Sequence, residues 1–174
     1  MKFVVAIFAT TFLFFGICHS QDTVQTPNGK LKYDEDWGYV TVRQNAHTFW
    51  WLMTVKSDPT RPLILWLQGG PGSDSTGFGN IEELGPKDIN LQDRNNTWLQ
   101  VADLVFVDNP VGAGFSYVDS NSAFTTNVKQ IGQDLMVWAK AFFKKHPEYQ
   151  TRDFYIFCES YGGKMSAEFG KQLQ

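Results

Sequence analysis

Residues 154–163 read Phe-Tyr-Ile-Phe-Cys-Glu-Ser-Tyr-Gly-Gly: an apolar run, then a serine, then two glycines. This stretch decides how the rest of the chain is interpreted. The apolar run at the start is typical of a buried strand, and the residues from Lys164 onward favour a helix. A strand that enters a helix through a tight turn can present a serine, here Ser160, as a nucleophile. Gly162 suits such a turn, because a glycine lets the helix pass close to the strand. The usual pattern has glycine also where Cys158 stands, so an ordinary strand-to-helix turn is the alternative interpretation.

Two further apolar runs lie upstream, at residues 62–67 and 104–107, and neither alternates with polar residues. Continuous apolar runs of this length are typical of strands buried on both faces, as in parallel sheets. Segments 37–43 and 47–55 are rich in aromatic and β-branched residues and predict an antiparallel hairpin. The chain is therefore expected to form an α/β domain with a mostly parallel sheet, entered through this N-terminal hairpin.

One long helix is expected between the second and third apolar runs. Residues 127–145 place apolar side chains on a single helical face, and Thr126 is the expected N-cap. Pro147 follows directly and would end the helix. A helix between two buried strands agrees with the α/β interpretation.

A glycine-rich segment, residues 68–73 (Gln-Gly-Gly-Pro-Gly-Ser), follows the first buried strand. Backbone N–H groups at the carboxyl end of a parallel strand can stabilise an oxyanion, together with the N–H of the residue after the nucleophile, here Tyr161. A flexible surface loop is the alternative interpretation, but it does not explain why the segment directly follows a fully buried strand. We therefore expect the glycine-rich segment and the serine turn to form one catalytic site.

The composition excludes several function classes. With 15 Lys and Arg against 18 Asp and Glu, the net charge is −3, so the basic surface that nucleic acid binding requires is missing. The two cysteines and three histidines lack the spacing of a metal site. Met165 follows Gly163-Lys164 where a phosphate-binding loop has Ser or Thr. We therefore expect no nucleic acid partner, no metal and no cofactor.

The N-terminus predicts a signal peptide over residues 1–20. Lys2 precedes an apolar run, residues 3–17, and cleavage after Ser20 fits the small residues there. A membrane anchor is the alternative, but the run is shorter than the roughly 20 residues that span a bilayer. Asn95, in the triplet Asn-Asn-Thr, is a candidate glycosylation site, which agrees with the secretory pathway.

Three motifs together resemble the serine carboxypeptidases. The motifs occupy residues 66–73, 108–117 and 159–163. The resemblance covers nearly all of residues 21–174 and implies an α/β-hydrolase fold, of which this chain would form the N-terminal half of the central sheet. It also implies removal of C-terminal residues from peptides at acid pH. By position, Ser160 would be the nucleophile, and Gly70 and Tyr161 would donate backbone N–H groups to the oxyanion.

The same resemblance implies a site for the terminal carboxylate of the substrate, formed by Gln68, Gly69 and Glu159. The family usually has Asn where this chain has Gln68, and Gly where it has Cys158. Two carboxylates in contact cannot both be ionised at low cost, so Glu159 would share a proton with the substrate. Binding is therefore expected to weaken as the pH rises.

The catalytic triad of this fold runs in the order Ser, then Asp or Glu, then His. Residues 161–174 contain Glu168 but no histidine. Glu168 is expected within the helix that follows Ser160, and His47 and His146 are expected at the surface. Without a general base the serine hydroxyl is a poor nucleophile, so this chain by itself is not expected to hydrolyse peptides.

Three functions are compatible with these observations. The first, which we favour, is the N-terminal portion of a secreted or lysosomal serine carboxypeptidase whose Asp and His lie downstream. The second is a short, catalytically inactive secreted homologue that binds peptide C-termini or a protein partner. The third is an esterase or lipase, which is disfavoured because Glu159 and Gln68 would have no role there.

Overall fold

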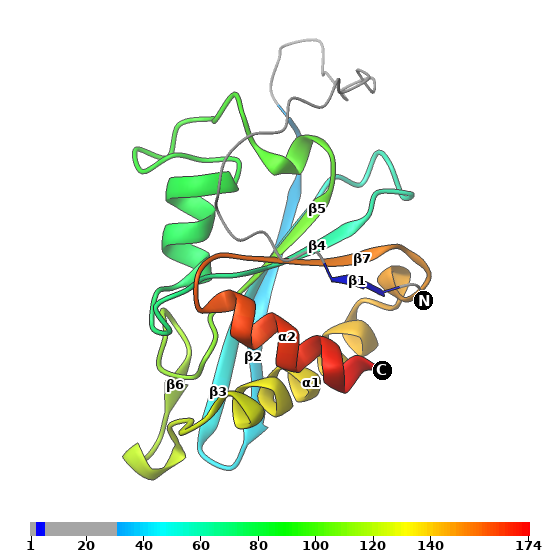
Figure 1. Cartoon of the computed structure of the whole chain (residues 1–174). Coiled ribbons are helices and arrows are strands. Elements are labelled where there is room, and N and C mark those ends of the chain that lie inside the picture. The colour runs from blue at the N-terminus through cyan, green and yellow to red at the C-terminus, as the bar shows by residue number, and fades with distance from the viewer. Residues whose placement is uncertain (1–2, 6–30) are drawn as a thin grey trace.

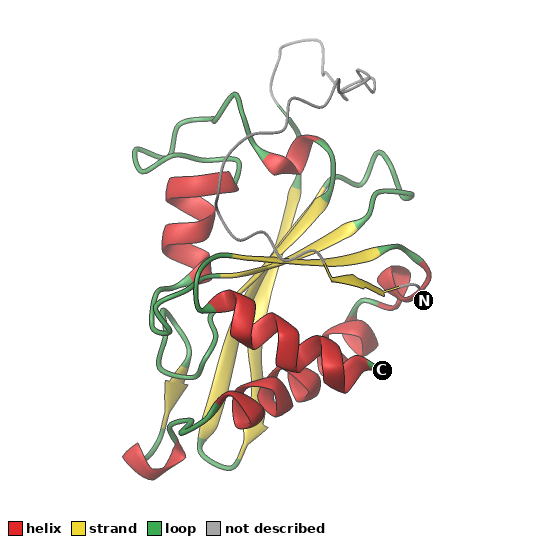
Figure 2. Ribbon diagram, in the orientation of Figure 1, coloured by secondary structure: helices red, strands yellow, loops and turns green. Residues whose placement is uncertain are grey.

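The computed structural model describes residues 3–5 and 31–174, and for residues 3–5 it describes the backbone alone. These residues form one seven-stranded sheet with helices on both faces (Figures 1 and 2). The strands are β1 (Phe3–Val5), β2 (Asp34–Arg43), β3 (Ala46–Thr54), β4 (Leu63–Leu67), β5 (Asp103–Val107), β6 (Tyr117–Val118) and β7 (Phe154–Cys158). The α-helices are α1 (Val128–Lys145) and α2 (Gly162–Leu173). A π-helix, η1 (Ser75–Leu84), and three 3₁₀ turns, η2 (Trp98–Gln100), η3 (Asn121–Ala123) and η4 (Pro147–Thr151), complete the fold.

The strand order is β1-β7-β4-β5-β3-β2, with β6 paired to β3. Strands β4, β5 and β7 are parallel, and Leu65 of β4 pairs with Val105 on one side and Ile156 on the other. The β2–β3 hairpin is antiparallel and joins the sheet through an antiparallel pairing of β3 with β5. The mostly parallel sheet entered through a hairpin is therefore confirmed. Because β4, β5 and β7 are parallel, the segments that follow these three strands leave the same end of the sheet.

Each face of the sheet has its own hydrophobic core. Side chains of β4 alternate between the two: Leu63, Leu65 and Leu67 pack on the face of α1 and α2, while Ile64 and Trp66 pack on the opposite face. All five are buried, which explains why this strand has no polar position. Burial on both faces fixes the position of β4, and with it the position of the glycine-rich segment that follows.

Helix α1 has the bounds that its apolar periodicity predicts. Its buried positions include Ile131, Leu135, Trp138 and Phe142, which repeat at helical spacing. The expected N-cap was wrong by one residue: Asn127, and not Thr126, caps the helix. The Asn127 side chain accepts a hydrogen bond from the backbone N–H of Gln130 at 2.9 Å. Both residue types are good caps, so the sequence does not separate two neighbouring candidates.

Of the predicted signal peptide, only residues 3–5 are described, as β1, whose backbone pairs in parallel with β7. The prediction for residues 1–20 otherwise lies outside the described residues. Among the helices of residues 31–174, none combines the length and the apolar character that a bilayer crossing requires.

Candidate active site

The turn between β7 and α2 holds Ser160 in a left-handed conformation, with φ at +50°. Such a φ is uncommon for a residue with a side chain and persists only where the surroundings enforce it. Here the Glu159 N–H donates to the Leu67 carbonyl at 3.2 Å, and the Gly162 N–H donates to the Glu159 carbonyl at 2.8 Å. The turn is thus attached to the neighbouring strand β4, and the exposed Ser160 stands at its apex. The predicted strand, tight turn and helix are all present.

Gly162 is required by the close approach of α2 to β4. A Cβ at this position would lie 2.4 Å from the Leu67 carbonyl oxygen and 2.9 Å from the Cβ of Cys158. The backbone oxygen cannot move aside, so no side chain fits there. Cys158 itself is buried, and its thiol is free. A cysteine is therefore compatible with this turn, although the usual pattern has glycine at its position.

The glycine-rich segment after β4 passes directly against Ser160. A Cβ on Gly69 would lie 2.8 Å from the Cβ of Ser160 and 3.3 Å from its Oγ. Gly70 has φ at +107°, a conformation in which a Cβ would meet the Gly72 nitrogen at 2.4 Å. Within the described residues, the backbone N–H groups of Gly70 and Tyr161 have no hydrogen-bond partner. Two free donors near a serine hydroxyl are what the stabilisation of an oxyanion requires.

Gln68 and Glu159 are in contact beside the serine. The Gln68 Nε2 donates to Glu159 Oε2 at 2.6 Å, and the Gln68 Oε1 accepts from Trp66 Nε1 at 2.7 Å. Gln68 is only 3% exposed, so these contacts fix its amide. The extra methylene of Gln relative to the usual Asn therefore does not leave the side chain unanchored. The structure brings together Gln68, Gly69, Glu159 and Ser160, as the resemblance implied.

Glu83 joins this group, and the sequence analysis missed it. Glu83, in helix η1, lies near Gln68 and Glu159, and its Oε2 is buried without a hydrogen-bond partner among the described residues. Burial, together with the negative charge of Glu159, raises the pKa of Glu83. No local pattern could reveal this contact, because Glu83 and Glu159 lie far apart in the chain and only the packing of η1 beside β4 joins them.

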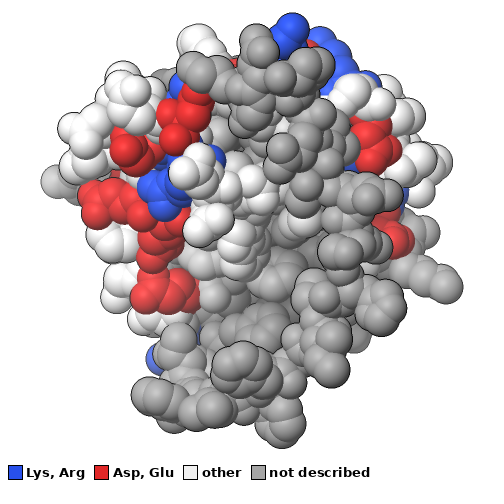
Figure 3. All heavy atoms as spheres, turned by 90° about the horizontal axis from the view of Figure 1, so that it is seen from above, with Lys and Arg blue, Asp and Glu red and all other residues white. Residues whose placement is uncertain are grey.

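Seen from above, Asp and Glu side chains gather along the left side of the described surface, with Lys and Arg side chains among them (Figure 3). This is the side where η1 stands in Figure 1.

Neither histidine of residues 31–174 interacts with Ser160. His47 Nε2 lies 2.9 Å from Asp119, and its ring stacks on Tyr117. His146 Nε2 lies 3.0 Å from Asp36 Oδ2, and the His146 ring packs edge-on against Trp50. Both side chains are partly exposed, at 18% and 13%, and pair with exposed carboxylates, so they lie at the rim of the surface and away from Ser160.

The remaining candidates lie away from the serine. Glu168 is in α2, where it accepts a hydrogen bond from Gln172. Asn95 is exposed in the segment between η1 and η2, and its glycosylation stays a prediction. No group of three His, Cys, Asp or Glu side chains in residues 31–174 is arranged to hold a metal ion. The described site thus contains an exposed serine, two nearby N–H groups without a described hydrogen-bond partner and a carboxyl cluster, and no described histidine contacts the serine.

The sequence profile of the serine carboxypeptidase family matches residues 26–174. Retinoid-inducible serine carboxypeptidase from Mus musculus is 54% identical over 151 residues, which cover 84% of this chain and 32% of the mouse protein. Serine carboxypeptidase-like 51 from Arabidopsis thaliana is 41% identical over 162 residues, covering 84% of this chain and 35% of that protein. The chain spans about a third of the length of the curated relatives it matches.

The fold is similar to that of Kex1, a prohormone-processing carboxypeptidase from Saccharomyces cerevisiae. The two structures superpose with a TM-score of 0.72 at 28% identity, over 80% of this chain and 33% of Kex1. The match confirms the α/β-hydrolase fold.

Proposed function

Because the chain belongs to the serine carboxypeptidase family, we propose that it carries the nucleophile and the substrate-carboxylate site of a serine-type carboxypeptidase. The observation that carries this proposal is the 2.6 Å contact between Gln68 and Glu159, directly beside the exposed Ser160. An esterase would have no need of a carboxyl group and an amide next to its nucleophile. A carboxypeptidase needs both to recognise a free peptide C-terminus.

In the proposed reaction the Ser160 Oγ attacks the last peptide carbonyl of the substrate. A bond forms between Oγ and the carbonyl carbon, and the oxyanion accepts hydrogen bonds from the N–H groups of Gly70 and Tyr161. The C–N bond then breaks, the C-terminal residue leaves with a proton on its nitrogen, and water hydrolyses the acyl-enzyme.

The proton of Ser160 must pass through a general base. The relatives are about three times as long as this chain, and we propose that residues corresponding to their remaining length supply the His and its Asp. The positions of His47 and His146, each paired with a carboxylate elsewhere, support this assignment.

We propose that this function has an acid pH optimum, and the carboxyl cluster supports this part of the proposal. When a substrate carboxylate joins Glu83 and Glu159, three carboxyl groups occupy one site, and at least one must hold a proton. Burial and the charge of Glu159 raise the pKa of Glu83, so Glu83 keeps its proton to a higher pH than an exposed glutamate does. As the pH rises, the proton is lost and repulsion weakens binding by about 1.4 kcal/mol for each pKa unit of differential interaction.

The experiment uses the protein expressed from its complete reading frame and matched pairs of peptide acids and peptide amides. We expect kcat/KM on the peptide acids to fall as the pH rises, whereas kcat/KM on the peptide amides should not show this fall. Glu159→Gln should flatten the profile on the acids, because its amide donates to the carboxylate at every pH. Glu168→Gln, on α2 away from the cluster, is the matched control. A parallel loss on acids and amides with Glu159 intact would contradict the role of Glu159.

A catalytically inactive protein that binds peptide C-termini is the second candidate. It is favoured by one observation: the described residues contain the carboxyl cluster but no base that contacts Ser160. A fluorophosphonate probe separates the two candidates, because it labels only an activated serine. Labelling of wild type but not of Ser160→Ala supports the peptidase. Binding of peptide acids without labelling supports the inactive form.

We also propose delivery through the secretory pathway, to the lysosome or the cell exterior, on the basis of residues 1–20 and the exposed Asn95. An Asn95→Gln variant should lose a glycan-dependent mobility shift on a gel, and a wild-type protein without such a shift would contradict the glycosylation.

A further inference from the structure

Asp108 follows β5 directly and holds a carboxylate that the proposed chemistry does not use. It is fully buried and accepts three hydrogen bonds. The Thr76 backbone N–H donates to Oδ1 at 2.9 Å, while the Thr76 hydroxyl and the Phe115 N–H donate to Oδ2 at 2.7 Å and 2.9 Å. A single buried carboxylate thus joins the end of β5 to the start of η1 and to the segment that contains Phe115.

The glycine-rich segment next to Thr76 has little packing of its own. Residues 70–73 are all exposed, so hydrogen bonds at the ends of the segment determine where it lies. On the β4 side, the Gln68 N–H donates to Ser75 Oγ at 3.0 Å, and the Ser73 N–H donates to the Gly69 carbonyl at 3.2 Å. On the β5 side, the contact is the double hydrogen bond between Thr76 and Asp108.

The Asp108 carboxylate cannot move or be replaced by water without displacing its neighbours. Gly114, with φ at +52°, closes over it: a Cβ there would lie 2.1 Å from Asp108 Oδ2 and 2.7 Å from the Cβ of Asp74. The Ser116 hydroxyl also donates to the Asp108 carbonyl at 2.6 Å. The carboxylate is therefore a fixed point between β5 and the first residue pair of η1.

We propose that Asp108 is a positioning residue, which acts through Thr76 to hold the glycine-rich segment so that the Gly70 N–H points at the oxyanion formed at Ser160. The inference rests on the proposed function for the reaction that it serves. The carboxylate-binding side chain of Gln68 is held separately, by Trp66. Loss of the Asp108 contacts should therefore affect the transition state more than substrate binding.

The test compares two buried carboxylates in the protein expressed from its complete reading frame. Asp108→Asn has the same shape but only one acceptor oxygen, so an N–H of Thr76 or Phe115 loses its partner. Asp134→Asn is the matched control, because Asp134 is equally buried but bonds Arg43 on the far side of the sheet from η1. Thr76→Val removes only the hydroxyl contact, and Thr76→Ser retains it.

We expect Asp108→Asn to lower kcat at least about tenfold with little change in KM, given that removal of a whole oxyanion donor costs about 10²–10³ in kcat. Thr76→Val should show the same pattern more weakly, and Thr76→Ser and Asp134→Asn should stay within about twofold of wild type in kcat. A fall in kcat that Asp134→Asn matches, or a rise in KM alone, would overturn the proposal.

Hydrogen exchange provides a readout that does not depend on turnover. In Asp108→Asn the hydrogen-bonded amides of Gln68, Ser73 and Thr76 should exchange faster than in wild type. A proteolytic peptide covering residues 68–76 reports this change, and the same peptide of Asp134→Asn should exchange as in wild type. Unchanged exchange in residues 68–76 would overturn the positioning role even if activity fell. If wild type shows no peptidase activity, the proposed function fails, and the exchange data still decide whether Asp108 holds the segment.

Discussion

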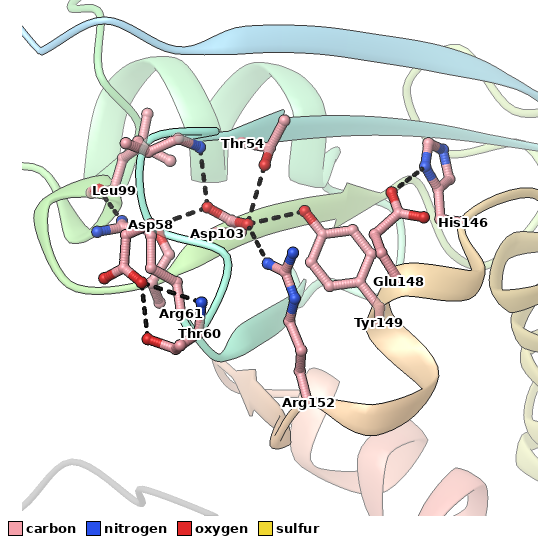
Figure 4. A network of polar contacts seen from close by, with 12 residues as sticks. Thr54, Asp58, Thr60, Arg61, Leu99, Asp103, His146, Glu148, Tyr149 and Arg152 are labelled. Carbon is pink, nitrogen blue, oxygen red and sulfur yellow. Dashed lines mark hydrogen bonds and ion pairs between the residues drawn. The ribbon is translucent and has the colours of Figure 1, made fainter.

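Substitution of Asp103 by Asn should destabilise the fold strongly without altering the active site. Asp103 is fully buried at the start of β5, and Figure 4 shows the polar groups that converge on it. Its carboxylate accepts hydrogen bonds from Thr54 Oγ1 at 2.9 Å, Val55 N at 3.0 Å, Arg61 Nε at 3.1 Å, Tyr149 OH at 2.8 Å and Arg152 Nη1 at 3.1 Å. The network connects the hairpin, the central strands and η4.

The size of the expected loss in the free energy of unfolding follows from the burial of Arg61, which is 4% exposed. Removal of one partner of a buried ion pair costs about 3–5 kcal/mol, because the other charge is left uncompensated. Arg61 also donates to the carbonyls of Leu99, Gln100 and Ala102, which partly stabilise its charge, so we expect the lower end of that range. At an unfolding entropy of about 2.1 cal/mol/K per residue, about 3 kcal/mol corresponds to a fall of about 3 °C in the thermal midpoint of a protein about three times as long as this chain.

Thermal and urea unfolding of the protein from its complete reading frame measure this effect. Asp34→Asn is the control, because its pair with Lys56 is exposed and is worth at most about 1 kcal/mol. Asp103 and Asp108 stand at opposite ends of β5, about 16 Å apart at about 3.3 Å per residue. Activity well below the midpoint should therefore be retained. If Asp103→Asn lowered the midpoint no more than Asp34→Asn, the ion-pair argument would be refuted.

Two further predictions concern the turn and the buried carboxyl groups. Gly162→Ala should lower the free energy of unfolding by about 1–3 kcal/mol or more, because its Cβ would lie 2.4 Å from the Leu67 carbonyl oxygen. It should also abolish labelling of Ser160 by the fluorophosphonate probe. A Gly162→Ala protein with the stability and labelling of wild type would contradict this. Burial raises the pKa values of Glu83, Asp108 and Asp134, so the native state binds protons more tightly than the unfolded state at these groups. Their contribution to the free energy of unfolding should therefore increase as the pH falls from neutral through the folded-state pKa values, until it is complete below the unfolded values. Urea midpoints at several pH values test this, and Asp134→Asn should reduce the dependence; a pH dependence that Asp134→Asn leaves unchanged would contradict the assignment.

The strands and the main helix could be predicted because their signals are local. The run at residues 63–67 has no polar position, and β4 is indeed buried on both faces. The period of apolar residues in 128–145 matched the buried face of α1. The N-cap could not be assigned to one residue, because Thr126 and Asn127 are both suitable caps. The π-helix η1 was missed, because its glycine-rich start is typical of a loop.

The sequence by itself determined the strand, turn and helix around Ser160 and the glycine-rich segment after β4, because both depend on residues that are neighbours in the chain. Only the tertiary structure decided that Glu83 joins Glu159, and that Asp108 holds Thr76. These contacts depend on the strand order, in which β4 lies between β5 and β7 and η1 packs beside them. Periodicity reports which face of an element is buried, but it carries no information on which distant element covers that face.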